Sequence, residues 1–109
     1  MNPALCPARP HVKVCCISSH EEADAALAAG AHALGLVSAM PSGPGVIDEA
    51  LIAAIAAQVA LQRPDVQTFL LTSQTSAAAI VAQHQRCRTT TLQLVDHVPP
   101  PELARLRTA

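Results

Sequence analysis

The sequence predicts an α/β fold in which short parallel strands alternate with helices. Four apolar, strand-like runs are each followed by a helical stretch of about 10–15 residues, the spacing typical of βαβ units. Half of the 109 residues are hydrophobic and only 14% are charged, which excludes a disordered chain. Lys and Arg number 7 against 8 Asp and Glu, so no basic surface for nucleic acid is expected.

The elements follow one another in regular order. Strands are predicted over residues 12–17, 33–37, 66–71 and 90–95. Helices are predicted over residues 20–29, after Asp48, from Ser73 or Thr75 to near Arg86, and over residues 99–106.

Local signals support the boundaries of the helices. Ser19 and Glu22 have the spacing of a capping box, and Gly30 is the residue type expected just past a helix end. Asp48 is a suitable N-cap, and the apolar residues after it recur at helical spacing, namely Leu51, Ile52, Ile55 and Val59. The loop 38–45 holds two prolines and two glycines, and serves either as a substrate-side loop or as a plain connector.

The alternation of side chains favours a barrel over a doubly wound sheet. The first strand is expected to place Val12, Val14 and Cys16 on one face and Lys13, Cys15 and Ile17 on the other. A doubly wound sheet is covered on both faces and requires both to be apolar. One face here mixes Lys, Cys, Thr and Gln, as the interior of a TIM barrel does near its active-site mouth, and no glycine-rich phosphate loop follows the first strand.

The remaining sequence features limit the class of protein to which the chain can belong. Residues 1–11 are Pro-rich without the apolar segment of a signal peptide, so a tail is expected before a single domain at 12–109. The longest apolar stretch, residues 50–61, is shorter than the roughly 20 residues of a membrane span, and no membrane contact is expected. The four cysteines lack metal-ligand spacing, and pairing Cys15 with Cys16 across two faces of a strand would be strained, so reduced thiols in the cytoplasm and no metal are expected.

Several segments resemble the phosphoribosylanthranilate isomerase family. Residues 12–18 (Val-Lys-Val-Cys-Cys-Ile-Ser) are similar to its opening Lys-Ile-Cys-Gly-Ile-Thr strand. Residues 28–37 (Ala-Ala-Gly-Ala-His-Ala-Leu-Gly-Leu-Val) are similar to its Ala-Gly-Ala-Asp-Ala-Leu-Gly segment. Residues 91–94 (Thr-Leu-Gln-Leu) resemble its fourth strand, and residues 101–103 resemble the start of the next helix. The similarity runs in order from residue 12 to residue 107.

The resemblance implies a (β/α)8 barrel of about twice this length, of which the chain would form the N-terminal half, about four of eight units. It implies an intramolecular aldose–ketose isomerisation, the Amadori rearrangement of N-(5′-phosphoribosyl)anthranilate in tryptophan biosynthesis, with a phosphosugar substrate and no cofactor. Cys15 takes the place of the general base that removes the sugar C2′ proton. Lys13, Gln93 and Asp96 are further candidates for contacts with the substrate.

The sequence departs from the family at residues that complete this chemistry. Cys16 stands where the family has glycine, and Val95 stands where its fourth strand has histidine. Residues 41–45 lack the loop arginine that contacts the anthranilate carboxylate. In the family, the general-acid aspartate and the phosphate loops belong to later units, and acid–base catalysis needs both groups at the sugar.

Three hypotheses therefore stay open. The chain is an incomplete isomerase-like enzyme, a truncated non-catalytic half-barrel that acts as an interaction or assembly module, or a divergent isomerase-like barrel with another substrate. Alternatively, Cys15 has no catalytic role and packs as a small hydrophobic residue. Two unpaired sheet edges invite strand pairing, so self-association is expected as well.

Overall fold

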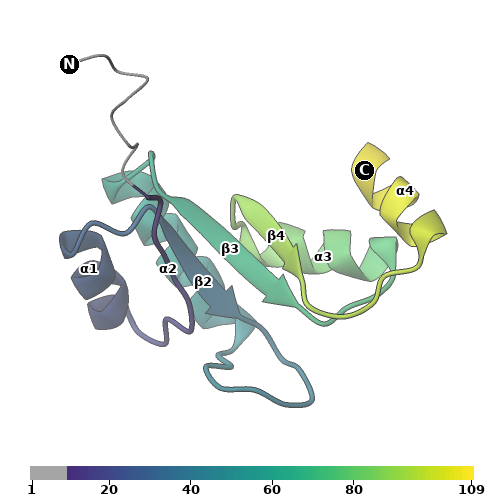
Figure 1. The fold of residues 1–109 in the computed structure, drawn as a ribbon, viewed down its shortest axis with the longest axis horizontal. Coiled ribbons are helices and arrows are strands. Elements are labelled where there is room, and N and C mark those ends of the chain that lie inside the picture. Colours follow the sequence, from purple (N-terminus) through teal and green to yellow (C-terminus); the bar gives the residue numbers. More distant parts are fainter. Residues whose placement is uncertain (1–9) are drawn as a thin grey trace.

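The computed structural model describes residues 10–109, in which four strands and four helices alternate (Figure 1). The strands are β1 (Lys13–Val14), β2 (Ala33–Val37), β3 (Gln67–Thr72) and β4 (Thr91–Leu94). The helices are α1 (His20–Ala28), α2 (Glu49–Gln62), α3 (Ala77–Cys87) and α4 (Pro100–Thr108). Most of the predicted tail lies outside the described residues, and no helix within them is long and apolar enough to cross a bilayer.

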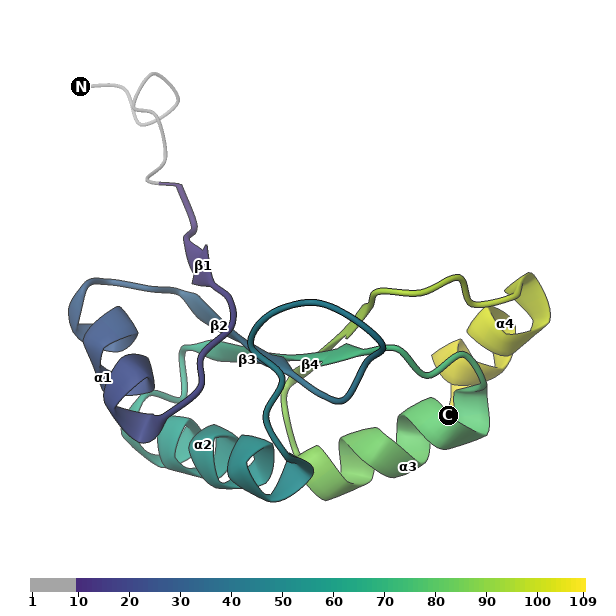
Figure 2. The same ribbon diagram turned by 90° about the horizontal axis from the view of Figure 1, so that it is seen from below.

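The strands form one parallel sheet in the order β1-β2-β3-β4. Every crossover moves to the next strand in the same direction, and α1, α2 and α3 lie on the same face of the sheet (Figure 2). A doubly wound sheet reverses its strand order and carries helices on both faces. The arrangement is that of consecutive units of a TIM barrel, which confirms the predicted fold class.

The hydrophobic core lies between the sheet and these helices. Leu34 and Leu36 of β2 and Leu70 of β3 are fully buried, and Ile52 and Ile55 of α2 pack against them with no exposed surface. Full burial of one such side chain contributes on the order of 1.5–3 kcal/mol. The helix-covered side therefore provides most of the hydrophobic stabilisation.

The opposite side, called here the inner face, carries Lys13, Gly35, Phe69 and Gln93, and no helix of the described residues covers it (Figure 2). The ammonium group of Lys13 lies 4.5 Å from the centroid of the Phe69 ring and donates a hydrogen bond to the side-chain oxygen of Gln93. This contact joins β1 to β4 across the two strands between them, on the inner face.

A polar network joins β3 to α2 and α3. The Thr72 hydroxyl donates to Gln83 Oε1 at 2.5 Å, and both side chains are buried. Gln83 Nε2 donates to Glu49 at 3.2 Å, and the Arg86 guanidinium donates to the same carboxylate at 2.6 and 3.2 Å. The hydrogen bond from Arg86 holds the pKa of Glu49 below its ordinary value.

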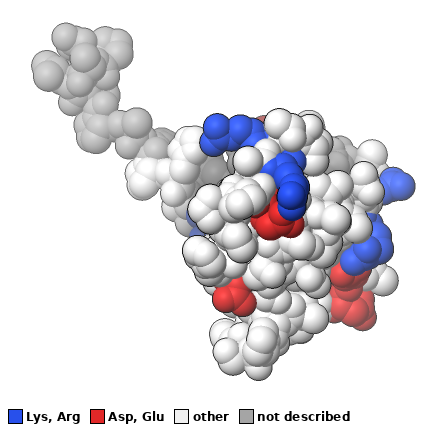
Figure 3. All heavy atoms as spheres, turned by 90° about the vertical axis from the view of Figure 1, so that its right-hand side faces the viewer, with Lys and Arg blue, Asp and Glu red and all other residues white. Residues whose placement is uncertain are grey.

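Basic and acidic side chains lie next to one another on the side of the molecule formed by α3 and α4 (Figure 3). Arg86 pairs with Glu49, and Arg105 pairs with Glu102 within α4. Glu102 also accepts the backbone N–H of Ala77 at 3.0 Å, which ties α4 to the start of α3.

The first strand differs from its prediction. β1 covers only Lys13–Val14 instead of residues 12–17, because Cys16 adopts a left-handed backbone with φ of 61° and ends the extended segment. Ile17 consequently turns into the helix-covered core, where it is 3% exposed, and does not share the face of Lys13 and Cys15 as the alternation predicts.

The helix starts agree with the sequence at two positions and differ at one. Ser19 accepts the N–H of Glu22, and Asp48 accepts the N–H of Leu51, as predicted. The N-cap of α3 is Ser76, whose hydroxyl accepts the N–H of Ala79, so the prediction of Ser73 or Thr75 is wrong. The other predicted boundaries lie within one or two residues of those observed, and Gly30 follows α1 with φ of 96°.

We expect Glu49→Gln to lower the midpoint temperature of unfolding by a few degrees at neutral pH, because it weakens the charged link between α2 and α3. The folded pKa of Glu49 is lowered, so its contribution is present above the unfolded-state pKa and is lost as pH falls through the folded value. Thermal melts at several pH values should therefore show the two proteins converging under acid.

The matched control is Arg107→Gln, which removes a positive charge on α4 that takes part in no ion pair within residues 10–109. It should leave the pH dependence unchanged. A difference between wild type and Glu49→Gln that stays constant from neutral to acidic pH would contradict the assignment.

Candidate active site

The carboxyl ends of the four strands meet at one edge of the sheet. Cys15 follows β1, the loop 38–47 extends from β2, Ser73 follows β3 and Asp96 follows β4 (Figure 1). Parallel (β/α) units present their active-site groups at this edge, because the loops after the strands converge there. The candidate active site is therefore the end of the inner face that carries Cys15.

Cys15 is placed by a close approach to β2. A Cβ atom on Gly35 would lie 2.8 Å from Cys15 Sγ and 3.1 Å from Cys15 Cα, so no residue larger than glycine fits without a shift of β1. The N–H of Ile17 donates to Gly35 O at 3.2 Å and continues the pairing of the two segments. Cys15 itself is exposed, so its thiol is accessible to a ligand at the mouth.

Cys16 holds the loop after β2. Its thiol donates a weak hydrogen bond to Pro44 O at 3.7 Å, and a Cβ on Gly45 would lie only 2.7 Å from Cys16 Cβ. Desolvation raises the pKa of the Cys16 thiol, and neighbouring Cys15 raises it further. The left-handed backbone of Cys16 favours glycine. This gives a physical reason for the glycine that follows the cysteine in the Lys-Ile-Cys-Gly-Ile-Thr strand, which the sequence resembles.

The turn from Cys16 into α1 is fixed by Glu22. Its carboxylate accepts hydrogen bonds from the N–H of Ser18 at 2.7 Å and from the Ser18 hydroxyl at 2.8 Å. These bonds lower the pKa of Glu22. The carboxylate thus reaches one residue further back than the Ser19 N–H that an ordinary capping box uses.

The other sequence-derived candidates separate into two groups. Lys13 and Gln93 meet on the inner face, where the Lys13 ammonium is directed at Gln93 and Phe69. Asp96 is exposed at the mouth and lines a different hollow, together with Met40, Pro41, Ser42, Ser73 and Val95. Within residues 10–109, no three His, Cys, Asp or Glu side chains are grouped to hold a metal ion.

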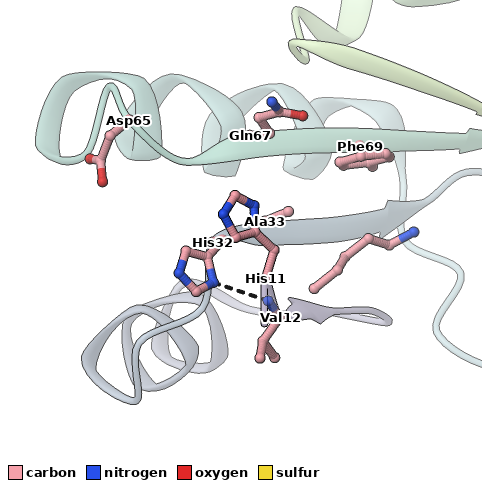
Figure 4. A pocket seen from close by; sticks show the side chains of 8 residues that line it. His11, Val12, His32, Ala33, Asp65, Gln67 and Phe69 are labelled. Atoms are coloured by element: carbon pink, nitrogen blue, oxygen red, sulfur yellow. Dashed lines mark hydrogen bonds between the residues drawn. The ribbon is translucent and has the colours of Figure 1, made fainter. Parts of the chain in front are cut away.

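Sequence reasoning missed a second hollow at the amino ends of the strands (Figure 4). The rings of His11 and His32 stack with centroids 4.6 Å apart, and His32 Nδ1 accepts the N–H of Val12 at 3.0 Å. The hollow measures about 260 Å³ and is bordered by Asp65 and Gln67. Only the pairing of β1 with β2 brings the two histidines together, and this end of a barrel contributes to stability more than to chemistry.

Sequential parallel strands with helices on one face define the class as a half-barrel of four (β/α) units of the TIM-barrel type. Comparisons with known proteins then show which proteins of this class the chain is similar to. The chain is 49% identical over 51 residues to N-(5′-phosphoribosyl)anthranilate isomerase of Chromohalobacter salexigens, a match that covers 47% of this chain and 24% of that protein. No family model matches the sequence.

Solved structures show the same similarity over a longer range. The phosphoribosyl anthranilate isomerase of Thermus thermophilus aligns with a TM-score of 0.78 and 26% identity, over 91% of this chain and 48% of that one. An isomerase in complex with reduced 1-(o-carboxyphenylamino)-1-deoxyribulose 5-phosphate aligns with a TM-score of 0.80 and 20% identity, over 92% and 50%. The resemblance to phosphoribosylanthranilate isomerase is confirmed, and the chain spans about half the length of the structures it matches.

Gly35→Ala should destabilise the chain by about 1–3 kcal/mol, because the added methyl group overpacks the contact with Cys15. Cys15→Ala removes the sulfur atom that lies nearest to the added methyl group. The free energy of unfolding of the double variant should therefore fall by less than the sum of the decreases in the two single variants. Urea unfolding of the four proteins measures this coupling.

Gly30→Ala provides the control, since alanine is strained at Gly30 only by the positive φ of 96°, and no atom lies within 4 Å of the missing Cβ. This substitution should lower the free energy of unfolding, and its effect should add to that of Cys15→Ala without any coupling energy. Additive losses for Gly35→Ala and Cys15→Ala would show that the close approach is absent.

Cys16→Gly should raise the midpoint temperature of unfolding by a few degrees, because glycine adopts a φ of 61° without steric cost. Cys16→Val should lower it, since a β-branched residue is least compatible with this region. Thermal melts followed by circular dichroism compare the three proteins. An unchanged or lower midpoint for the glycine variant would argue against the left-handed backbone.

Proposed function

We propose that this chain supplies the first half of a phosphoribosylanthranilate isomerase barrel and acts in tryptophan biosynthesis, with a cytoplasmic location. The observation that carries the proposal is the placement of Cys15: an accessible thiol at the carboxyl edge of the first strand, against Gly35. The sequence and structural similarity to these isomerases supports it. The free thiols of Cys15, Cys16 and Cys87 fit a reducing compartment.

In the proposed reaction the Cys15 thiolate removes the proton from C2′ of the ring-opened aminoaldose. The electron pair released at C2′ forms the C1′=C2′ bond, and the electrons of the protonated C1′=N bond move to nitrogen, which gives an enolamine. Transfer of the C2′ hydroxyl proton to C1′ then gives the aminoketose, with no net change in redox state. General base catalysis of this kind contributes about 10²–10⁴-fold to the rate. An exposed position after a strand lets the thiol approach a substrate that lies over the inner face.

We further propose that Lys13 and Gln93 line the substrate side of the inner face, where an ammonium and an amide can contact polar groups of a phosphosugar. Asp96 is proposed to contact the substrate from the mouth. The general acid and the phosphate site are assigned to four further strand–helix units, on the same or on a second polypeptide. Full activity therefore requires both halves of the barrel.

Growth of a tryptophan auxotroph that lacks this isomerase tests the proposal. The chain should restore growth when it is co-expressed with the C-terminal half of a phosphoribosylanthranilate isomerase. Cys15→Ala should abolish growth and lower kcat of the purified pair by at least about 10²-fold, because the base is lost. Cys16→Gly, which introduces the family's residue, should retain growth.

Growth that persists with Cys15→Ala would overturn the assignment of the base. Failure of the intact chain in every combination would favour the non-catalytic hypothesis of an assembly module.

A second candidate role, self-association, is favoured by the two sheet edges. Within residues 10–109, β1 pairs only with β2, and β4 pairs only with β3, so each has one side without a strand partner. Val12 and Val95, which flank these edges, are 48% and 43% exposed. We propose that a second copy of the chain pairs with these edges and covers the open inner face.

Sedimentation velocity of the 109-residue chain at several concentrations should show a dimer. Val12→Lys and Val95→Lys should shift the equilibrium toward monomer, because a lysine at a strand edge opposes pairing. Leu61→Lys is the matched control: Leu61 is 86% exposed on α2, away from both edges. A single monomeric species with a cooperative thermal transition would contradict the proposal.

A further inference from the structure

Two adjacent thiols lie at the carboxyl end of β1, whereas the proposed isomerisation uses one. Cys15 and Cys16 both line a groove between β1 and α1, together with Val14, Ile17 and Ala25. Cys15 is exposed and Cys16 is half-buried, so both can be reached by a small reagent. The second thiol is therefore accessible and has no assigned role.

The backbone at Cys16 removes the usual obstacle to an interaction of neighbouring side chains. In a regular strand, successive side chains point to opposite faces. The φ of 61° at Cys16 breaks this alternation, and both residues border the same groove. Cys15 raises the pKa of the Cys16 thiol, which agrees with the proximity of the two residues.

We propose that Cys15 and Cys16 form a redox-active dithiol, which closes to a vicinal disulfide by exchange with a low-molecular-weight disulfide such as oxidised glutathione. The Cys15 thiolate attacks one sulfur of oxidised glutathione, forms a mixed disulfide and releases one glutathione thiolate. The Cys16 thiolate then attacks the Cys15 sulfur and releases the second glutathione. The two cysteines are oxidised, and one molecule of oxidised glutathione is reduced to two of the thiol.

This disulfide is expected to be reversible. Neighbouring Cα atoms are about 3.8 Å apart, below the usual range of about 4.4–6.8 Å for a disulfide, so the bond is strained. Strained or exposed disulfides have more oxidising potentials and are the labile ones. Cys87 offers the contrast: it has no exposed surface, and burial raises its pKa to about 11, so it should not react in the folded chain.

Closure of the disulfide has one consequence that rests on the proposed function. A Cys15 sulfur bonded to Cys16 cannot accept the C2′ proton, so oxidation would switch off the isomerase. Closure also draws Cys16 Sγ away from Pro44 O, which releases a weak contact of the loop after β2. The thiol chemistry itself does not depend on the reaction that the barrel catalyses.

The experiment treats the purified 109-residue chain with excess oxidised glutathione, blocks the remaining thiols under denaturing conditions, and maps the products by mass spectrometry. A Cys6→Ser background prevents exchange with Cys6, which lies outside the described residues. The peptide that contains Cys15 and Cys16 should lose the mass of two hydrogen atoms, and dithiothreitol should restore it. Cys87 should carry the blocking group.

Cys16→Gly is the matched variant, because glycine fits the left-handed backbone and preserves the fold. It should stop at a mixed disulfide between Cys15 and glutathione. Glutathione that stays bound to Cys15 in the chain that retains Cys16 would overturn the proposal, as would the absence of any modification. The readout requires no turnover, so failure here is distinct from failure of the proposed isomerase activity.

Discussion

Leu34, Leu36 and Leu70 project from β2 and β3 into a layer of helix side chains, and this burial on one side constrains the rest of the molecule. Because α1, α2 and α3 all pack on that side, the crossovers run in one direction and the strands add in sequence order. The opposite side is left for Lys13, Phe69 and Gln93, which contact one another across the sheet. A barrel-type inner face is thus a consequence of where the apolar side chains are buried.

The candidate site depends on a second constraint, the space left by Gly35. The backbone and sulfur of Cys15 occupy the position where a side chain of residue 35 would lie. β1 therefore approaches β2 closely up to Cys15, and the left-handed conformation of Cys16 then ends the strand and sends Ile17 into the core. One short segment accordingly has two functions: it anchors α1 to the core through Ile17, and it presents a thiol outside the core through Cys15.

The sequence predicts much of this architecture and less of the site. Apolar periodicity and the caps Ser19 and Asp48 identify the order of elements, because these signals are local. The early end of β1 is not predicted, since cysteine gives no local sign of a positive φ. The buried link from Thr72 to Gln83 and the stacking of His11 on His32 also escape prediction, because residues far apart in the sequence meet only in the folded sheet. The sequence already shows that Cys16 and Val95 differ from the residues of the isomerase family at these positions. Only the structure shows that the backbone at residue 16 is left-handed, which explains why the family has glycine there.

The central claim is that Cys15 is an accessible thiol at the mouth of a half-barrel, while Cys87 is a core residue. Alkylation of the folded, reduced chain with iodoacetamide, quenched over time and mapped by mass spectrometry, measures this difference directly. Cys15 should be modified rapidly under native conditions, and Cys87 only at the rate at which the chain unfolds. Equal protection of Cys15 and Cys87 would place Cys15 in the core as an ordinary packing residue, and would contradict the account of the site.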